Sequence, residues 1–339
     1  MIEAERLGNL QASKKTRQRI VHTMKSYPVE ILNAVFTPMF DDGSVNYARI
    51  PDLFQHSIQT GANGIFLNGT TGECMSLNTN ERKRLIETWV EYRESIKRPD
   101  FKIFAHVGSC NLFETAQMAE HAQSQGVDGI AMVATFYFRP QSVEALVEQC
   151  AYVAAAAPQT PFYYYNIPTL TGVDLSLIDF MELASKRIPN FAGLKNSFTD
   201  IVDYQHCIHF AKDRYSLYWG TDETFMMLYT AGNRKYVGST YNYMSAVYHK
   251  MLAAYYAGDF KGVTRLQGEA DAIYKVLLQF NGIAAGKEVM KFIGVDCGKV
   301  RKPLKAITNL ESETLFKKLN ETTFFLHAPE KKEPVSILK

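Results

Sequence analysis

The sequence predicts a (β/α)8 TIM barrel with a C-terminal helical extension, and two observations support this fold class. Eight short apolar runs recur at nearly even spacing, and segments with helical periodicity lie between them. The runs also lack alternation of apolar and polar residues, which is typical of parallel strands covered on both faces. A doubly wound sheet fits less well, because no Gly-x-Gly-x-x-Gly turn follows the first run.

The predicted strands and helices follow one another along the chain. The strands cover residues 31–39, 64–70, 102–108, 129–135, 161–167, 191–197, 215–221 and 235–240. A helix is expected over 78–96, because Asn78 and Glu81 have the spacing of a capping box. The stretches "NLFETAQMAEHAQSQG" (111–126) and "SVEALVEQCAYVAAAA" (142–157) also have helical periodicity.

The chain continues beyond the eighth run with more helical segments than a closed barrel needs. These are "SAVYHKMLAAYYAGD", "FKGVTRLQGEADAIYKVLLQFNG" and "GKEVMKFIGV". We therefore expect a polar N-terminal extension over 1–28, the barrel over 29–245, a helical appendage over 246–325 and a polar tail over 326–339.

Composition and charge exclude several classes of protein. The 339 residues are 46% hydrophobic and 21% charged with a net charge of +2, and no basic stripe indicates a nucleic-acid partner. The longest apolar stretches are too short to span a bilayer, so no membrane partner is expected. Residues 1–28 lack the apolar region of a secretory signal, and Glu3 and Glu5 argue against a mitochondrial presequence.

The five cysteines lie far apart, which favours reduced thiols in a cytoplasmic protein.

Polar residues gather at the ends of the predicted strands, where the active sites of such barrels lie. Lys195 follows the apolar run 191–194, and burying its ammonium costs several kcal/mol unless the group is paired or loses its proton. A lysine without its proton is a nucleophile. If the strands close one barrel, Lys195 points into a pocket ringed by Thr70, Thr71, Tyr165, Asp222, Glu223 and Ser239.

The motif "GTTGE" (69–73) favours an anion receptor. Its glycines would let the backbone turn tightly and expose its N–H groups, while Thr70 and Thr71 add hydroxyl donors for a small carboxylate or phosphate. The alternative is a helix cap, because Thr70 and Glu73 also have capping-box spacing.

Three tyrosines in a row, at 163–165, could serve only to pack the core. In a strand, Tyr163 and Tyr165 face one way and Tyr164 faces the other. Tyr165 lies nearest the catalytic end of the predicted barrel, where a phenol beside a lysine can pass protons to and from a reacting oxygen.

The remaining titratable groups leave alternatives open. Asp222 and Glu223 could favour a helix N-terminus by their charge, or they could accept hydrogen bonds from a polyhydroxylated substrate. His106 and His121 carry no partner motif and are expected to be structural. No set of carboxylates and histidines has metal-ligand spacing, so no metal is expected.

Four motifs together carry a family resemblance. They are "GTTGE", "YNIPTLTG", "GLKNS" and "GSTYNY", in this order and at strand ends. From about residue 30 to about 310 the chain resembles the pyruvate-dependent class I aldolases of the N-acetylneuraminate lyase and dihydrodipicolinate synthase superfamily. The resemblance implies a Schiff-base lysine at Lys195, an acid–base tyrosine at Tyr165 and a pyruvate-carboxylate site at Thr70 and Thr71. It also implies no cofactor and a homotetramer.

The stretches "YYYNIPTLTG", "WGTDE" and "GSTYNY" favour the N-acetylneuraminate lyase branch. There, the matching residues that hold the sugar chain are Ser197, Gly220, Asp222, Glu223 and Ser239. Synthases that condense aspartate semialdehyde carry an arginine where this chain has Leu170, which cannot grip a second carboxylate.

The sequence departs from the family pattern at two places. Phe198 and Thr199 are larger than is usual in the family, and "NRKYVGST" lacks the glycines common before the eighth strand.

The expected activity is therefore the reversible cleavage of N-acetylneuraminate to pyruvate and N-acetylmannosamine. The alternatives within enzymes are a 2-keto-3-deoxy sugar acid aldolase and a dihydrodipicolinate synthase. The alternative from another class is a ligand-binding barrel without activity. The presence of the lysine, the tyrosine and both threonines in one chain argues against this alternative.

Overall fold

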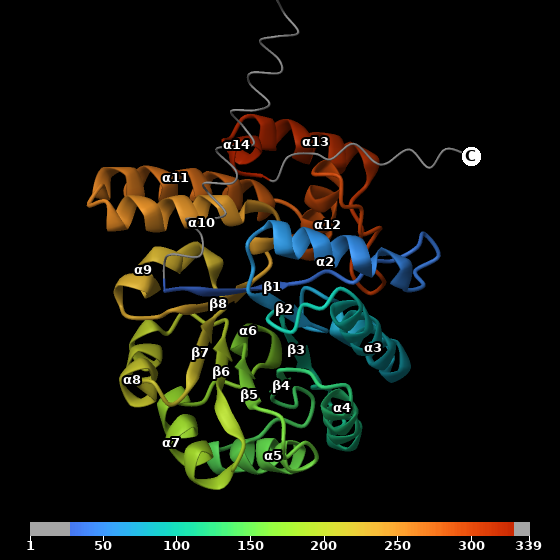
Figure 1. Cartoon of the computed structure of the whole chain (residues 1–339), viewed down its shortest axis with the longest axis vertical. Coiled ribbons are helices and arrows are strands. Elements are labelled where there is room, and N and C mark those ends of the chain that lie inside the picture. Colours follow the sequence, from blue (N-terminus) through green and yellow to red (C-terminus); the bar gives the residue numbers. More distant parts are fainter. Residues whose placement is uncertain (1–27, 329–339) are drawn as a thin grey trace, which may run out of the picture.

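Eight parallel strands close into a barrel in the computed structural model of the chain, which describes residues 28–328 (Figure 1). The strands are β1 (Glu30–Ala34), β2 (Gly64–Leu67), β3 (Lys102–His106), β4 (Gly129–Val133), β5 (Phe162–Asn166), β6 (Phe191–Asn196), β7 (Ser216–Trp219) and β8 (Lys235–Gly238). They pair in chain order, and β8 pairs with β1, so that Val237 lies opposite Leu32. The predicted fold class is confirmed. Each strand is shorter than its predicted run, because the last residues of each run form the loop that follows.

Helices cover the outside of the barrel. They are α2 (Ile50–Gln59), α3 (Thr79–Ser95), α4 (Leu112–Ser124), α5 (Val143–Ala155), α6 (Pro168–Thr171), α7 (Leu177–Arg187), α8 (Ile201–Ala211), α9 (Phe225–Thr230) and α10 (Tyr241–Tyr256), with the short 3₁₀ helices η1 (Tyr47–Arg49), η2 (Cys74–Ser76) and η3 (Asp222–Thr224). The predicted capping box begins α3. The Asn78 side chain accepts a hydrogen bond from the Glu81 N–H, and the Glu81 carboxylate accepts one from the Asn78 N–H.

The C-terminal helices form a second layer on one side of the barrel (Figure 1). After α10 the chain forms α11 (Phe260–Leu277), α12 (Gly282–Phe292), α13 (Asn309–Asn320) and α14 (Phe324–His327). Helix α10 contacts β1 and β8, and α11 packs on α10. The expected boundary between barrel and appendage, at 245 and 246, falls inside α10. Residues 1–27 of the expected N-terminal extension and 329–339 of the expected tail lie outside the described residues.

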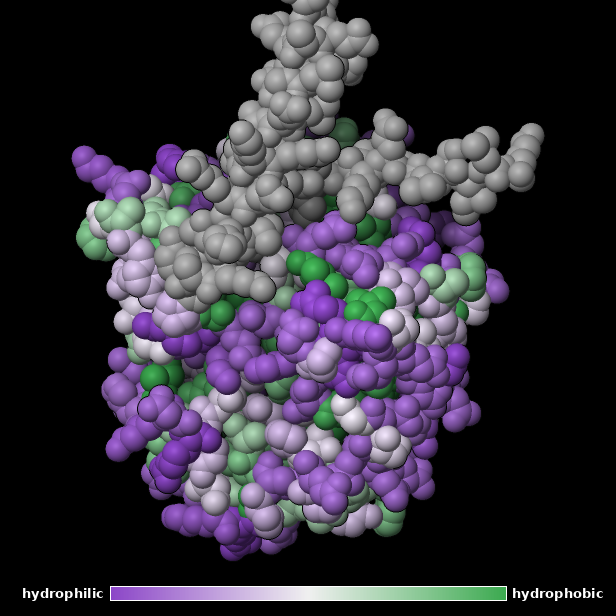
Figure 2. Space-filling view, in the orientation of Figure 1, coloured by the Kyte–Doolittle hydropathy of each residue, from purple (hydrophilic) through white to green (hydrophobic). Residues whose placement is uncertain are grey.

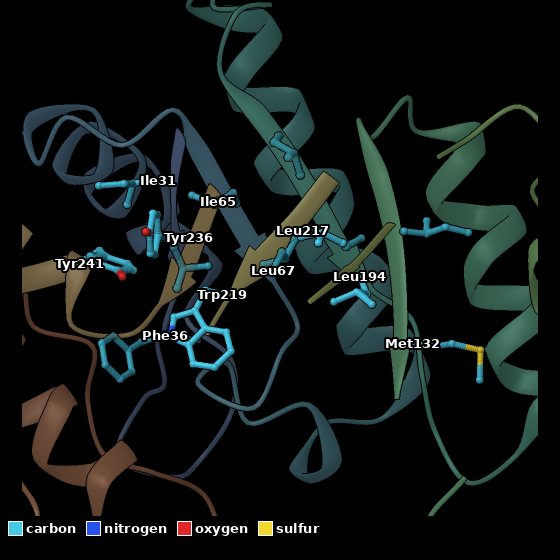
Figure 3. Close-up of a cluster of buried hydrophobic side chains, with 14 of the residues drawn as sticks. Ile31, Phe36, Ile65, Leu67, Met132, Leu194, Leu217, Trp219, Tyr236 and Tyr241 are labelled. Carbon is cyan, nitrogen blue, oxygen red and sulfur yellow. The ribbon is translucent and has the colours of Figure 1, made fainter. Parts of the chain in front are cut away.

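Side chains of the strands divide between two cores. Ile31, Ile65, Leu67, Leu194 and Leu217 point away from the barrel axis and pack against the helices (Figure 3). The other face of the strands fills the barrel, where the rings of Phe104, Tyr163 and Tyr218 lie 5.2–5.8 Å apart between centroids. Because these aromatic rings occupy the interior, the open space lies at the carboxyl ends of the strands.

The surface in Figure 2 is mostly hydrophilic, with hydrophobic residues scattered among the polar ones. Within residues 28–328, none of the helices combines the length and the apolar character that crossing a membrane requires.

Candidate active site

Lys195 lies near the carboxyl end of β6, beside Tyr165 of β5 in the strand register. Its side chain is buried, and its ammonium lies 4.0 Å from the ring centroid of Tyr165 and 4.2 Å from that of Phe66. Between residues 28 and 328 it forms no ion pair with a carboxylate. The nitrogen of this buried lysine therefore faces aromatic rings instead of an acid.

The phenol of Tyr165 connects the lysine to the predicted anion receptor. Its hydroxyl lies 3.4 Å from Oγ1 of Thr70, in the loop after β2. Tyr163 and Tyr165 belong to the interior core and Tyr164 to the outer one, as the alternation of side chains in a strand requires. Lysine, phenol and threonine hydroxyl thus meet at the mouth of the barrel, and the half-buried Thr71 follows in the same loop.

The turn in "GTTGE" differs from the expectation. The left-handed residues are Asn68 (φ 56°) and Glu73 (φ 59°), whereas neither glycine has a positive φ. The glycines are needed for space instead. A β-carbon on Gly69 would lie 2.7 Å from the ring of Phe66, and one on Gly72 would lie 3.3 Å from a backbone oxygen of Val35.

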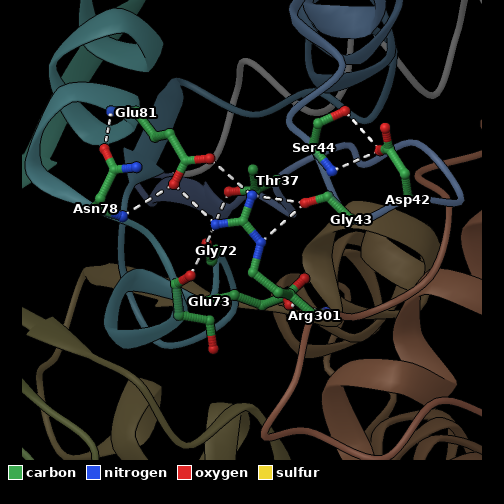
Figure 4. Close-up of polar contacts among 10 residues, drawn as sticks. Thr37, Asp42, Gly43, Ser44, Gly72, Glu73, Asn78, Glu81 and Arg301 are labelled. Atoms are coloured by element: carbon green, nitrogen blue, oxygen red, sulfur yellow. Dashed lines mark hydrogen bonds and ion pairs between the residues drawn. The ribbon is translucent and has the colours of Figure 1, made fainter.

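Glu73 holds this loop to the C-terminal layer rather than capping a helix with Thr70. Its carboxylate lies 2.6 Å from Nζ of Lys287 on α12 and accepts a hydrogen bond of 2.7 Å from the backbone N–H of Arg301. The guanidinium of Arg301 binds both carboxylate oxygens of Glu81 and the carbonyl oxygen of Gly43 (Figure 4). Sequence reasoning missed Lys287 and Arg301, which no local motif marks.

Asp222 lies after β7 and is buried. Its Oδ2 accepts hydrogen bonds from the backbone N–H and the hydroxyl of Thr240, at 3.0 and 2.6 Å. Its Oδ1 has no partner among the described residues. Burial, reinforced by the nearby Glu223, raises the pKa of Asp222 to about 7, against the opposing effect of the Thr240 hydrogen bonds. Gly238 makes room for this carboxylate, because a β-carbon there would overlap Oδ1.

The other predicted sugar-chain residues lie on the same side of the barrel. The hydroxyl of Ser197 donates to the carbonyl oxygen of Gly220 at 3.4 Å, and Gly220 approaches Cε of Lys195 closely. Ser239 is half-buried between Gly238 and Thr240, while Glu223 is exposed beside Asp222. These polar groups follow β6, β7 and β8, whereas the threonine pair follows β2.

A cavity of about 270 Å³ is lined by Thr70, whereas Lys195, Tyr165 and Asp222 are not among the residues that line it. Leu170, on α6, lies at its rim with 61% of its surface exposed. The lining combines the loops after the strands with the C-terminal segment, from which Ile283, Pro303 and Leu304 contribute. This wall is mostly apolar, so the C-terminal layer helps to form the entrance of the site.

His106 lies in this site, which the expectation of a purely structural histidine did not foresee. It ends β3, lines the cavity, and its Nδ1 lies 3.0 Å from the carbonyl oxygen of Asn68, so that Nδ1 carries the proton. Burial, with Arg82 and Lys195 nearby, holds the pKa of His106 well below its ordinary value. Its position at a strand end is the signal that could have identified it. His121 lies on α4, where it pairs with Glu87.

Among residues 28–328, no group of three or more histidine, cysteine or carboxylate side chains could hold a metal ion. All five cysteines are free thiols. The chemistry that the site can offer from its own residues is that of an amine, a phenol, an imidazole, hydroxyls and carboxylates.

Comparisons with known proteins identify the family of the chain. The model of the dihydrodipicolinate synthetase family matches residues 27–322. The chain is 35% identical to the N-acetylneuraminate lyase of Rattus norvegicus, over 87% of this chain and 93% of that protein. It is 32% identical to that of Homo sapiens, over 87% and 92%.

Solved structures are similar as well. The N-acetylneuraminate lyase of Proteus mirabilis superposes with a TM-score of 0.83 at 32% identity, over 87% of this chain and 99% of that chain. The sialic acid aldolase of Aliivibrio salmonicida gives a TM-score of 0.84 at 32% identity, over 89% and 99%.

Proposed function

The chain belongs to the dihydrodipicolinate synthetase family, and we propose that it is a class I aldolase that cleaves N-acetylneuraminate reversibly to pyruvate and N-acetylmannosamine. The observation that carries the proposal is the setting of Lys195. This lysine is buried at a strand end, faces two aromatic rings instead of a carboxylate, and lies beside a phenol that reaches Thr70.

The reaction begins when the neutral amine of Lys195 attacks C2 of the keto acid. The adduct loses water, with the proton for the departing oxygen supplied by Tyr165, and an iminium ion remains. This cation accepts the electron pair of the C3–C4 bond. The Tyr165 phenolate takes the proton of the C4 hydroxyl as that bond breaks, which releases N-acetylmannosamine. The enamine left on Lys195 gains a proton at C3, and water then frees pyruvate and the lysine.

The remaining residues bind the two ends of the substrate. Thr70 and Thr71 donate to the carboxylate of the keto acid. The hydroxyl groups of the sugar are bound by residues that follow β6, β7 and β8, namely Ser197, Gly220, Asp222, Glu223 and Ser239. Leu170 itself cannot pair with a second carboxylate of a substrate. The guanidinium of Arg139, beside Gly172, is held by the carbonyl oxygen of Phe136.

Trapping with borohydride tests the proposal. Incubation with pyruvate and borohydride should add the reduced pyruvyl mass to the peptide that contains Lys195 and should inactivate the enzyme. The peptide with Lys287, another buried lysine, serves as the internal control and should stay unmodified. A Lys195→Arg variant should lose turnover, because a guanidinium is never a neutral nucleophile at working pH. Labelling at another lysine would refute the mechanism.

A cytoplasmic location and a homotetrameric assembly belong to the same proposal, supported by family resemblance. Light scattering on the purified full-length chain tests the assembly, and a monomer in dilute solution would exclude it.

A further inference from the structure

We infer that three hydroxyl groups, those of Thr240, Tyr248 and Tyr274, position the carboxylate of Asp222 for the sugar chain of the substrate. We call these three groups the hydroxyl chain. The inference rests on the proposed function, because that function makes Asp222 an acceptor for substrate hydroxyls.

The hydroxyl chain is continuous and buried. The hydroxyls of Tyr248 and Tyr274 lie 2.6 Å apart, and they lie 2.8 Å and 3.2 Å, respectively, from Oγ1 of Thr240. Oγ1 of Thr240 in turn lies 2.6 Å from Oδ2 of Asp222. Its members come from the loop after β8, from α10 and from α11, and all three side chains are buried. It therefore runs from the C-terminal layer to the mouth of the barrel.

The hydrogen bond between Thr240 and the carboxylate has a fixed direction when Asp222 is ionised. A carboxylate only accepts, so Thr240 donates its single hydroxyl proton to Asp222. Oγ1 of Thr240 can then only accept, and the proton from a tyrosine must point toward it. Hydrogen bonds arranged head to tail polarise one another, which strengthens the final bond to the carboxylate.

This arrangement leaves one oxygen of Asp222, which is buried beside Gly238, as its only carboxylate oxygen without a donor from the described residues, so a substrate hydroxyl has to approach this oxygen to bind Asp222. Oδ2 is bound by two donors of Thr240, whereas Oδ1 has no partner among residues 28–328. The absence of a side chain at Gly238 gives Oδ1 its space. With Oδ2 fixed, the carboxylate cannot rotate, and Oδ1 stays in one place as a hydrogen-bond acceptor. Thr240, Tyr248 and Tyr274 are thus positioning residues that act through Asp222.

Tyr241 provides a matched control within the same cluster. It lies on α10 with its ring 4.8 Å from that of Tyr248 between centroids, and it is equally buried. Its hydroxyl has no hydrogen-bond partner in the described part of the chain. A Tyr241→Phe variant therefore removes a buried phenol oxygen of the same kind without interrupting the hydroxyl chain.

The test measures the synthetic direction of the reaction. In this direction pyruvate and N-acetylmannosamine are separate substrates, each with a KM of its own. Tyr248→Phe and Tyr274→Phe should raise KM for N-acetylmannosamine by about two- to tenfold, the equivalent of one ordinary hydrogen bond. Thr240→Val should raise it by about ten- to a hundredfold, because it also removes a bond to a charged group. Thr240→Ser, which keeps the hydroxyl, should restore most of the loss. KM for pyruvate and the rate of Schiff-base formation should stay unchanged, and Tyr241→Phe should behave as the wild type.

A double-mutant cycle shows whether the effect passes through Asp222. In an Asp222→Ala background, Tyr248→Phe should have no further effect on KM for N-acetylmannosamine. Equal effects of Tyr248→Phe and Tyr241→Phe, or parallel rises of KM for both substrates, would overturn the inference while the proposed function stands. A wild-type protein that forms the pyruvate Schiff base but does not use N-acetylmannosamine would overturn the proposed function and this assignment together.

Discussion

The ammonium of Lys287 lies 2.6 Å from the carboxylate of Glu73, and both side chains are almost completely excluded from solvent. The contact joins helix α12 of the C-terminal layer to the loop that carries Thr70 and Thr71. Lys287 also donates to the carbonyl oxygen of Lys299 at 2.9 Å. The loop that is proposed to bind the substrate carboxylate is therefore fixed from behind by a segment far away in sequence.

Lys287→Met should lower the free energy of unfolding by about 3–5 kcal/mol, because it leaves the carboxylate of Glu73 buried without its partner. Denaturant unfolding measures the loss. Lys305→Met is the matched control. It breaks the exposed pair with Glu311, which is worth about 1 kcal/mol or less. The double variant Glu73→Gln, Lys287→Met should be more stable than Lys287→Met alone. Equal losses from the two lysine variants would show that the buried pair contributes no more to the free energy of unfolding than the exposed pair.

Two glycine substitutions should have opposite effects. Gly238→Ala places a methyl group where Oδ1 of Asp222 lies, and it should lower the free energy of unfolding by about 1–3 kcal/mol and impair turnover. Gly268→Ala changes a position inside α11 where a β-carbon meets nothing within 4 Å, and it should stabilise the protein by about 0.5–1 kcal/mol. Thermal unfolding and an activity assay of the two variants check this contrast, which fails if both shift in the same direction.

Asp222 should make stability depend on pH with a definite sign. Its pKa is about 7 in the folded protein and 3.8 ordinarily, so the folded state binds the proton more tightly. The contribution of Asp222 to the free energy of unfolding is complete below about pH 4, and it is lost as the pH rises to about 7. Relative to an Asp222→Asn variant, the wild type should lose free energy of unfolding between about pH 4.5 and 7.5. Parallel profiles in denaturant titrations would contradict the raised pKa.

Leu170 should determine whether a second carboxylate is accepted. Leu170→Arg should open some condensation of pyruvate with aspartate semialdehyde, because a guanidinium at the rim of the cavity can bind that carboxylate. Leu278→Arg, a change at another exposed leucine on the C-terminal layer, should not. Assays of both variants with the semialdehyde check this, and equal activity of the two would mean that the rim does not select the substrate.

Much of the fold and the proposed centre of the site could be predicted because they depend on local patterns. Apolar runs and helical periodicity predicted the order of elements, and polar residues at strand ends indicated where Lys195 and Tyr165 would meet. Their neighbouring positions in β5 and β6 follow once the barrel closes in chain order.

The parts that could not be predicted depend on contacts between distant residues. Arg301 meets Glu73 across 228 positions of sequence, and no spacing rule links them. The left-handed backbone also lies at Glu73 and Asn68, whereas the pattern of glycines pointed to Gly69 and Gly72. Likewise, Tyr274 reaches Thr240 from α11, and only the packing of α11 on α10 brings the two hydroxyls together.

The anchoring of Glu73 by Arg301 has a consequence for biosynthesis. During translation, the loop after β2 leaves the ribosome long before residue 301 is made, so the nascent chain passes through a stage in which most strands exist and this loop has no anchor. A ribosome-stalled chain that lacks residues 287–339 should therefore expose Glu73 to solvent and to proteases. The proposed carboxylate receptor is therefore complete only after residue 301 has been made and has left the ribosome.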